Sequence, residues 1–188
     1  MGAGKSHALH SIDKKGNFPL SSYVLVDPDK IRQCLPEYYL CMKQNPLYAG
    51  EFTCKEAGYI AEIITIAALR DGKYVLVDGT LRDWQWYLNK FIELRCDYPN
   101  VKISILHVDA PKETIIERAT KRGIATGRYI PRRTLERAMG QVSRSIEILR
   151  KHADFYCRLY NRPGEHNDVE LVTEGITWET FRLNYGLL

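Results

Sequence analysis

Continuous apolar runs mark the expected strands of this chain. The same five residues, YVLVD, occur at 23–27 and again at 74–78. Because such runs lack polar alternation, they are typical of strands that are buried on both faces of a parallel sheet. A third run covers 102–108 and a weaker one covers 155–160, and a last strand is expected at 169–173. The pattern therefore predicts strands along the whole length of the chain.

Between the strands, apolar residues recur at the three- and four-residue spacing of helices. The clearest case is 51–70, which Gly72 follows as a helix-ending glycine. Further helices are expected over 83–96 with Asp83 as N-cap, from Pro111, over 132–152 and from Thr177. Because strands alternate with helices, the chain is predicted to be α/β, a three-layer fold with a central parallel sheet flanked by helices. The chain has no linker or low-complexity tract, so residues 1–188 are expected to form a single domain.

The composition fits a globular protein with an anionic ligand. Of 188 residues, 45% are hydrophobic and 27% are charged, and the formal net charge is +4. This charge is too small to indicate nucleic-acid binding. The five cysteines are scattered and never form a C-x-x-C pair, which disfavours disulfides and zinc sites. No run approaches the roughly 18 apolar residues of a membrane span, and the N-terminus has no apolar signal-peptide core, so a cytoplasmic location is predicted.

The first residues, MGAGKSH, allow two interpretations. Gly4-Lys5-Ser6 matches the end of the phosphate-binding pattern G-x-x-x-x-G-K-[ST], in which backbone N–H groups at a helix start hold phosphate oxygens. In such a loop Lys5 neutralises the phosphates of ATP and the Ser6 hydroxyl coordinates Mg²⁺. Met1-Gly2 with Ser6 also matches the N-myristoylation pattern, but one acyl chain without a second signal binds membranes only marginally.

Two aspartates, Asp27 and Asp78, directly follow the repeated strands. Ligands of parallel α/β sheets bind beyond the carboxyl ends of the strands. These carboxylates are therefore placed to hold Mg²⁺, to accept a hydroxyl proton or to bind a substrate hydroxyl. The alternative is that each one caps the next helix, because Asp27-Pro28 and Asp78-Gly79-Thr80 are also turn and N-cap sequences.

Two arginines, Arg122 and Arg128, flank a predicted loop at 123–127 that Pro131 follows. Guanidinium groups on a closing lid can stabilise the charge that spreads over a transferring phosphoryl group. The alternative is a solvated basic surface, because other lysines and arginines lie nearby in the sequence.

Six stretches of the chain follow one another in the order of a known family. They are GAGKS at 2–6, VDPDKIR at 26–32, the helix with Glu62, VLVDGTLR at 75–82, the lid from Arg122 to Pro131, and RLYNRPG at 158–164. Together they resemble the zeta-toxin family of P-loop kinases. GKS and the aspartates are common to small-molecule kinases, whereas V-D-G-T-L-R and R-L-Y-N-R are more particular to this family.

The resemblance implies a role for each matching residue. The catalytic group would be Lys5, Asp27, Arg122 and Arg128, with Asp27 as the general base for the acceptor hydroxyl. The ATP site would contain Gly2, Ala3, Gly4, Lys5 and Ser6, with Tyr160, Asn161 and Arg162 near the adenine and Ser6 on Mg²⁺. The acceptor pocket would be lined by Asp29, Glu62, Asp78, Thr80 and Arg82.

The implied activity is transfer of the γ-phosphate of ATP to a hydroxyl of a small molecule. In the family the acceptor is the 3′-hydroxyl of the sugar in UDP-N-acetylglucosamine. Where the bacterial toxins have E-G-T, this chain has Asp78, whose side chain is one methylene shorter, so the acceptor stays open. A small-metabolite kinase of the same superfamily and a non-catalytic nucleotide-binding or interaction module are the alternatives. The sequence identifies no antitoxin partner.

The phosphate-binding pattern is incomplete at its front. Its first glycine would fall before Met1, and in this fold class a strand precedes the loop and runs between the neighbours that end in Asp78 and Val108. Without that strand, its neighbours would keep unpaired backbone groups and an apolar gap. We therefore expect the natural domain to extend upstream, so that 1–188 is a kinase domain truncated at its N-terminus.

Overall fold

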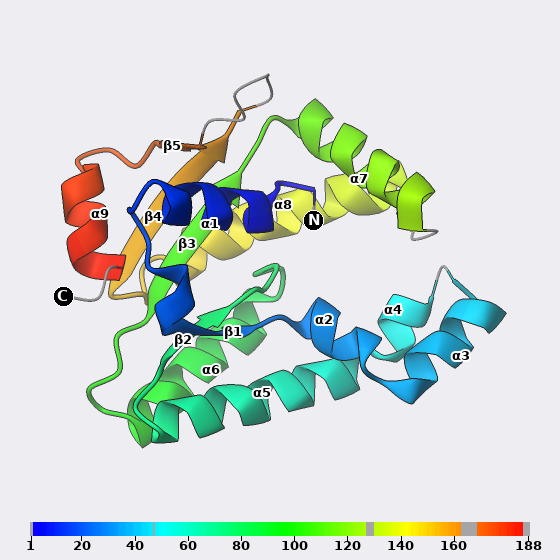
Figure 1. Cartoon of the computed structure of the whole chain (residues 1–188), viewed down its shortest axis with the longest axis horizontal. Helices are drawn as coiled ribbons and strands as arrows, with labels where there is room; N and C mark the ends of the chain where they lie inside the picture. The colour runs from blue at the N-terminus through cyan, green and yellow to red at the C-terminus, as the bar shows by residue number, and fades with distance from the viewer. Residues whose placement is uncertain (1, 47, 127–129, 163–168, 186–188) are drawn as a thin grey trace. The chain divides into compact units, whose positions relative to one another are not determined.

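The computed structural model describes residues 2–46, 48–126, 130–162 and 169–185 (Figure 1). The chain divides into two compact units, and each is described by itself. Unit 1 consists of Met1–Pro19, Thr80–Ala119 and Pro131–Leu188, and unit 2 consists of Leu20–Gly79 and Thr120–Ile130. Throughout the described ranges, every helix falls short of the length or apolarity that a membrane-spanning segment requires.

Unit 2 is built on two parallel strands, β1 (Tyr23–Val26) and β2 (Tyr74–Val77), which pair in register from Tyr23 opposite Tyr74 onward. The long helix α5 (Cys54–Arg70) connects them in the chain and packs against both. The strands and this helix were predicted from the apolar pattern. Gly72 has a φ of 67°, as expected of a glycine that ends a helix.

Three short helices of unit 2 correct the sequence prediction. They are α2 (Pro28–Gln33), α3 (Pro36–Gln44) and α4 (Ala49–Phe52), and a 3₁₀ turn, η1 (Leu20–Ser22), precedes β1. The predicted helix 51–70 is in fact divided at Thr53, which is buried and whose hydroxyl donates to the Ala49 carbonyl at 2.8 Å. The signal for α2 and α3 was present, because each begins with the proline that is favoured at a first helical position.

Unit 1 contains a second sheet, in the order β3 (Ser104–Asp109), β4 (Phe155–Asn161) and β5 (Val169–Leu171). The first pair is parallel, as predicted, but β5 is antiparallel to β4. The reason is the short connection between them, since a parallel neighbour requires a crossover of a dozen residues or more. The connection is 162–168, and its residues 163–168 lie outside the described residues.

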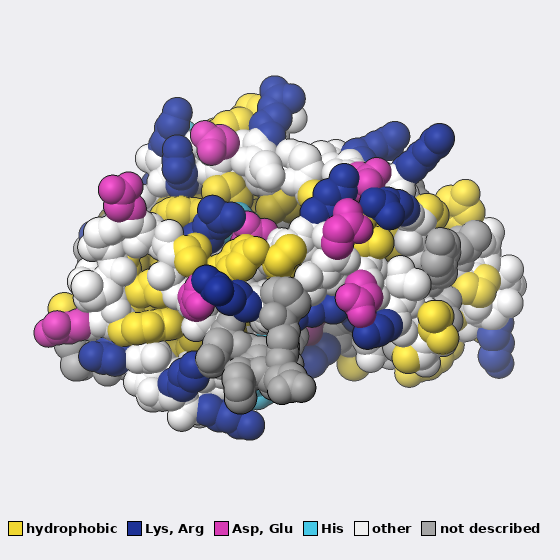
Figure 2. Space-filling view, turned by 90° about the horizontal axis from the view of Figure 1, so that it is seen from above, with side chains coloured by type: hydrophobic (Ala, Val, Ile, Leu, Met, Phe, Trp, Pro, Cys, Tyr) yellow, Lys and Arg dark blue, Asp and Glu magenta, His cyan; other side chains and the backbone are white. Residues whose placement is uncertain are grey.

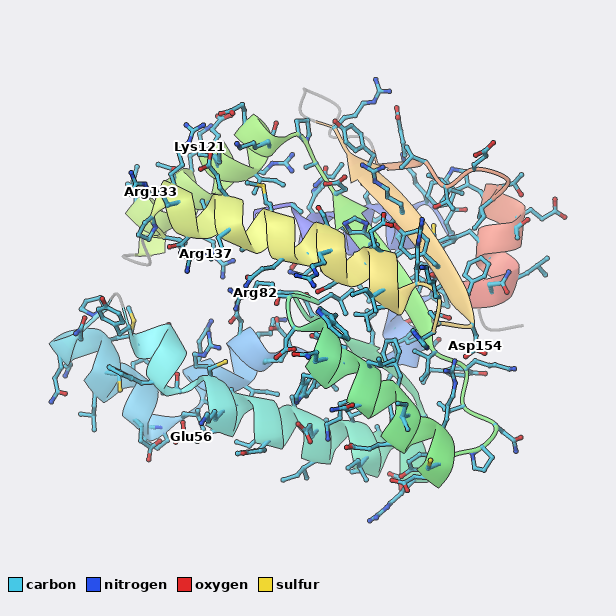
Figure 3. All side chains as sticks on the ribbon, turned by 180° about the vertical axis from the view of Figure 1, so that it is seen from behind. Glu56, Arg82, Lys121, Arg133, Arg137 and Asp154 are labelled. Atoms are coloured by element: carbon cyan, nitrogen blue, oxygen red, sulfur yellow. The ribbon has the colours of Figure 1, made fainter. Side chains whose placement is uncertain are left out.

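Five helices belong wholly or in part to unit 1: α1 (Lys5–Lys14), α6 (Trp84–Asp97), α7 (Lys112–Thr126), α8 (Arg132–Leu149) and α9 (Trp178–Tyr185). Helix α1 lies on one face of the β3–β4 pair and α8 lies on the other, as the two opposite views show (Figures 1 and 3). The predicted layering of a sheet between helices is therefore confirmed for this unit. Helix α6 begins after Asp83, whose carboxylate accepts from the Trp86 N–H at 3.1 Å as predicted.

The last helix, α9, contributes to the core of unit 1. Phe181 is fully buried and stacks on Tyr185 with ring centroids 4.7 Å apart. The Tyr185 hydroxyl donates to the Ile105 carbonyl of β3 at 2.7 Å. The helix that was expected from Thr177 is thus present as α9, and it packs into the core of unit 1.

The described strands thus form two sheets, β1–β2 and β3–β4–β5. Among the described residues, β2 pairs only with β1, and β3 pairs only with β4. The strand that is expected to precede the phosphate loop stays a prediction, as does the single-domain boundary of 1–188.

The carboxylate of Asp154 should make unit 1 sensitive to acid. Asp154, labelled in Figure 3, accepts from the Ile103 N–H at 2.8 Å and from Arg95 Nη2 at 3.0 Å. The Ile103 hydrogen bond, more than Arg95, holds the pKa of Asp154 below its ordinary value of 3.8. Because the folded-state pKa is depressed, the stabilisation is present above the unfolded value and is lost as pH falls through the folded value.

We expect Asp154→Asn to lower the free energy of unfolding by about 1 kcal/mol at pH 7, because a neutral acceptor makes a weaker hydrogen bond. Below about pH 4 the difference from wild type should begin to shrink, because the unfolded-state carboxyl then binds a proton, and the folded-state carboxyl follows only at lower pH. Urea melts across this pH range measure both effects. The matched control is Asp97→Asn, which changes an exposed carboxylate at the end of α6. An undiminished difference at low pH would contradict the prediction.

Candidate phosphate-binding site

The glycines before α1 have a backbone shape that only glycine adopts without strain. Gly2 has a φ of 75° and Gly4 has a φ of 80°. A Cβ on Gly2 would lie 2.5 Å from the Ile115 carbonyl oxygen, and a Cβ on Gly4 would overlap Asn161 Nδ2. Gly4 is the N-cap of α1, and no side chain caps this helix. The turn therefore brings bare backbone to the start of a helix, which is the arrangement that cradles phosphate.

The helix that follows the turn has the predicted form. It begins at Lys5 and buries Ala8, Leu9 and Ile12 along one face. Lys5 is half-buried at the first helical position, and Ser6 is exposed at the second. The structure thus brings Gly2, Ala3, Gly4, Lys5 and Ser6 together as the loop-and-helix element that the sequence predicted.

Two side chains from distant parts of the chain hold this turn. Asn161, at the end of β4 and fully buried, donates from Nδ2 to the Ala3 carbonyl at 2.9 Å and to the Gly4 carbonyl at 3.5 Å. Arg118 on α7 donates from Nη1 to the same Ala3 carbonyl at 3.4 Å. Asn161 was predicted to lie near the adenine, which stays a prediction, and the structure places its amide against the phosphate loop. Arg118 was not predicted.

The other two residues of the predicted adenine loop differ in their surroundings. Tyr160 is half-buried within β4. Arg162 is exposed, and its Nε lies 2.9 Å from Glu170 Oε1 on β5. Their contact with a nucleotide base stays a prediction.

In unit 2, Asp27 and Asp78 come to the same edge of the β1–β2 sheet. Each follows the last residue of its strand, and the Asp78 N–H donates to the Val26 carbonyl at 2.8 Å. Asp27 Oδ1 accepts from the backbone N–H of Asp29 at 2.9 Å and of Lys30 at 3.3 Å, so the capping alternative is confirmed for Asp27. Its Oδ2 has no hydrogen bond to any described residue, and Asp27 can therefore both cap α2 and present an oxygen.

Asp78 does not cap a helix. The helix that follows it, α6, begins only after Asp83, which supplies the cap. The capping alternative is therefore wrong for Asp78. Its half-buried carboxylate lies at the strand end, and a role in binding Mg²⁺ or a substrate hydroxyl stays a prediction.

The predicted acceptor residues Asp29 and Glu62 lie on helices that pack against each other, α2 and α5. Asp29 Oδ1 pairs with Arg32 Nη1 at 2.7 Å, and Arg32 is buried. The Nε of Arg32 is buried without a partner among the described residues. Arg32 was not predicted as a site residue, although its i, i+3 spacing from Asp29 in the sequence was a usable signal.

Thr80 and Arg82 stand on either side of Leu81 in unit 1. Leu81 has a φ of 52°, the one positive φ at a described non-glycine residue. The Arg82 carbonyl accepts from the hydroxyl of Ser145 on α8 at 2.9 Å. Arg82 itself is exposed and lines a surface hollow.

The predicted lid is partly helical. Helix α7 continues through Thr126, so the expected loop at 123–126 is wrong, and the buried Gly123 is a helical residue. Arg122 is exposed on this helix. Arg128 lies outside the described residues.

A family model described as Zeta toxin matches residues 1–169. The chain belongs to the zeta toxin family. Among solved structures it is similar, with a TM-score of 0.64 and 19% identity, to a chain from work titled "Molecular and structural characterization of the PezAT chromosomal toxin-antitoxin system of the human pathogen Streptococcus pneumoniae". The alignment covers 100% of this chain and 76% of that one, and it supports the P-loop kinase-like fold. No curated protein sequence matches the chain.

The residues of this chain fit a nucleotide phosphate. The cradle at Gly2 and Gly4 is one that a Cβ would fill, and Lys5 and Ser6 stand at the start of α1 beside it. Within the described ranges, no three His, Cys, Asp or Glu side chains gather into a metal cage. Mg²⁺ needs none here, because it commonly binds through one or two protein oxygens together with substrate phosphates.

Proposed function

We propose that this chain is an ATP-dependent phosphotransferase that moves the γ-phosphate to a hydroxyl of a small molecule. The observation that carries the proposal is the phosphate loop. Its two left-handed glycines, its uncapped helix start and the Asn161 and Arg118 hydrogen bonds to the Ala3 carbonyl together form a fixed anion cradle. Membership of the zeta toxin family supports the same activity.

The proposed roles follow from the chemistry of each side chain. Lys5 would neutralise the β and γ phosphates, and Ser6 would hold the Mg²⁺ whose charge offsets theirs. Asp27 takes the proton from the acceptor hydroxyl through Oδ2 while its Oδ1 keeps the cap of α2. The acceptor oxygen bonds to the γ-phosphorus as the bond to the bridging oxygen breaks, and ADP leaves. Arg122 and Arg128 stabilise the charge on the transferring group.

The proposed acceptor is the sugar hydroxyl of a UDP-N-acetylhexosamine. Asp29, Glu62, Asp78, Thr80 and Arg82 are its proposed binding residues. The face shown in Figure 2 has acidic side chains interspersed among lysines and arginines. Nucleic-acid binding typically uses a patch of one sign, and the mixed charges of this face differ from such a patch.

A partner and a location are part of the same proposal. The similar solved chain comes from work on a toxin–antitoxin system. We propose that this chain acts in the cytoplasm and pairs with an antitoxin protein.

The deciding experiment is identification of the product by mass spectrometry. The chain is incubated with ATP and Mg²⁺ and with a panel of UDP-sugars and small alcohols, and EDTA is added in a parallel set. We expect one acceptor to gain a single phosphoryl group and EDTA to abolish the reaction. ATP binding without any phosphorylated product across the panel would replace the kinase with a non-catalytic nucleotide-binding module.

A further inference from the structure

Helix α5 exposes larger apolar side chains than it buries. Its buried residues are three alanines, and within unit 2 it packs against β1, β2, α2 and α4. On the side of the helix turned away from these alanines, Tyr59, Ile63 and Ile66 are 63%, 65% and 37% exposed. The solvent-facing side of a helix normally carries polar residues, so the apolar pattern of α5 is the reverse of the usual one.

The exposed apolar residues have the spacing of a helix-packing seam. They belong to a stripe whose members follow one another at intervals of three, four, three and four residues: Glu56, Tyr59, Ile63, Ile66 and Arg70. This is the a/d spacing by which two helices pack against each other. All five residues are exposed, and Glu56 is labelled near the start of α5 in Figure 3. The stripe is about 21 Å long, at a rise of 1.5 Å per residue.

The two ends of this α5 stripe carry opposite charges. Glu56 is the acidic residue of the first helical turn, and Arg70 is the basic residue of the last turn. A second α5 that ran parallel to the first would place like charges together at both ends. An antiparallel α5 would instead place each Glu56 beside Arg70 of the second copy. The charges therefore favour a helix of the same sequence that runs in the opposite direction.

Ile63 stands at the middle of the α5 stripe. It lies seven residues after Glu56 and seven residues before Arg70. If two copies of α5 lie antiparallel across a two-fold axis at Ile63, the two Ile63 side chains meet and Tyr59 packs beside Ile66 of the second copy. The stripe is thus complementary to itself, which a two-fold symmetric interface requires.

We propose that the α5 stripe is the docking surface for a second copy of this chain, which binds as an antiparallel helix pair related by a two-fold axis. Contiguous exposed apolar residues mark such interaction surfaces. Dimerisation through this stripe requires no nucleotide and no kinase activity. One helix pair buries little area compared with most specific interfaces, so we expect a Kd in the micromolar range.

Sedimentation equilibrium of the full chain measures this dimer. We expect the wild type to pass from monomer to dimer as its concentration rises to about 0.3 mM. Ile63→Asp should weaken association at least tenfold, because it places two carboxylates together at the two-fold axis. The control Ile124→Asp changes an isoleucine that is 80% exposed on α7, and it should leave association unchanged. A wild type that stays monomeric would assign the stripe to a different partner and overturn the proposal, as would equal weakening by the two variants.

Charge reversal tests the direction of the helix pair. Glu56→Arg and Arg70→Glu should each weaken self-association at least fivefold, because each leaves like charges together at both ends of the pair. An equimolar mixture of the two variants should associate as wild type does, since every end then joins opposite charges. The control Glu37→Arg reverses an exposed charge on α3 and should have no effect. Unchanged self-association of the two reversed variants would overturn the antiparallel pair.

A loss of helix stability must be distinguished from a loss of contact. Both reversals oppose the dipole of α5, and thermal melts of dilute monomer measure the cost. An unstable variant would not recover on mixing, so recovery in the mixture supports the contact, and two folded variants that fail to recover would overturn it. Ile63→Asp lies mid-helix, away from the ends on which the dipole acts, and it tests the surface even if a reversal unfolds the chain.

Discussion

Replacing Gly4 by alanine is expected to weaken ATP binding by more than 100-fold. Gly4 has a φ of 80°, and its Cβ would overlap the Asn161 amide that holds the loop. Asn161 is fully buried and has no room to withdraw, so either the turn or the end of β4 must shift. A shift moves the backbone groups that face the phosphates, and the whole cradle is lost rather than one contact.

The chain contains a matched control for backbone strain. Gly16, just after α1, has a φ of 68°, but a Cβ there would meet nothing within 4 Å. Gly16→Ala should therefore lower stability by about 1–2 kcal/mol, the cost of a left-handed residue, and leave ATP affinity unchanged. Calorimetric titration with ATP and thermal melts measure both variants. If both variants lost ATP affinity equally, backbone strain, and not the overlap with Asn161, would account for the loss in Gly4→Ala.

The elements that the sequence predicted are those whose signals are local. The runs 23–27, 74–78 and 102–108 became β1, β2 and β3 because uninterrupted β-branched residues have few other stable arrangements. Helix α1 followed from the apolar spacing after GKS. Helices α2 to α4 are short and carry little periodicity, so their prolines were the one available cue.

The parts of the site that were not predicted from the sequence depend on contacts between residues far apart in the chain. Asn161 and Arg118 reach Ala3 across 158 and 115 residues, and a single sequence carries no signal for such pairs. The direction of β5 was likewise decided by the length of its connection to β4, not by its own residues. At Asp27 the sequence suggested either capping or catalysis. The carboxylate has two oxygens, so one can cap α2 while the other remains available for catalysis.

Because one oxygen of Asp27 caps α2 and the other is proposed to act as the general base, the two roles can be tested separately. Asp27→Asn is expected to lower kcat by about 10²–10⁴-fold, the usual range for loss of a general base. The fold should not change, because asparagine and aspartate are equally good N-caps, so Oδ1 still accepts from the Asp29 N–H. ATP affinity and the melting temperature should stay close to wild type.

Two further variants separate the roles of the two oxygens. Asp27→Ala removes both the base and the cap, and it should lose about 1 kcal/mol of stability as well as activity. Asp71→Asn makes the same chemical change at an exposed residue of unit 2 after α5 and should alter neither quantity. Initial rates on the identified acceptor and urea melts of all three variants give the comparison. If Asp27→Asn retained more than a tenth of wild-type kcat, Asp27 would be a capping residue alone, and the base would have to be sought at Asp78, whose carboxylate has no helix to cap.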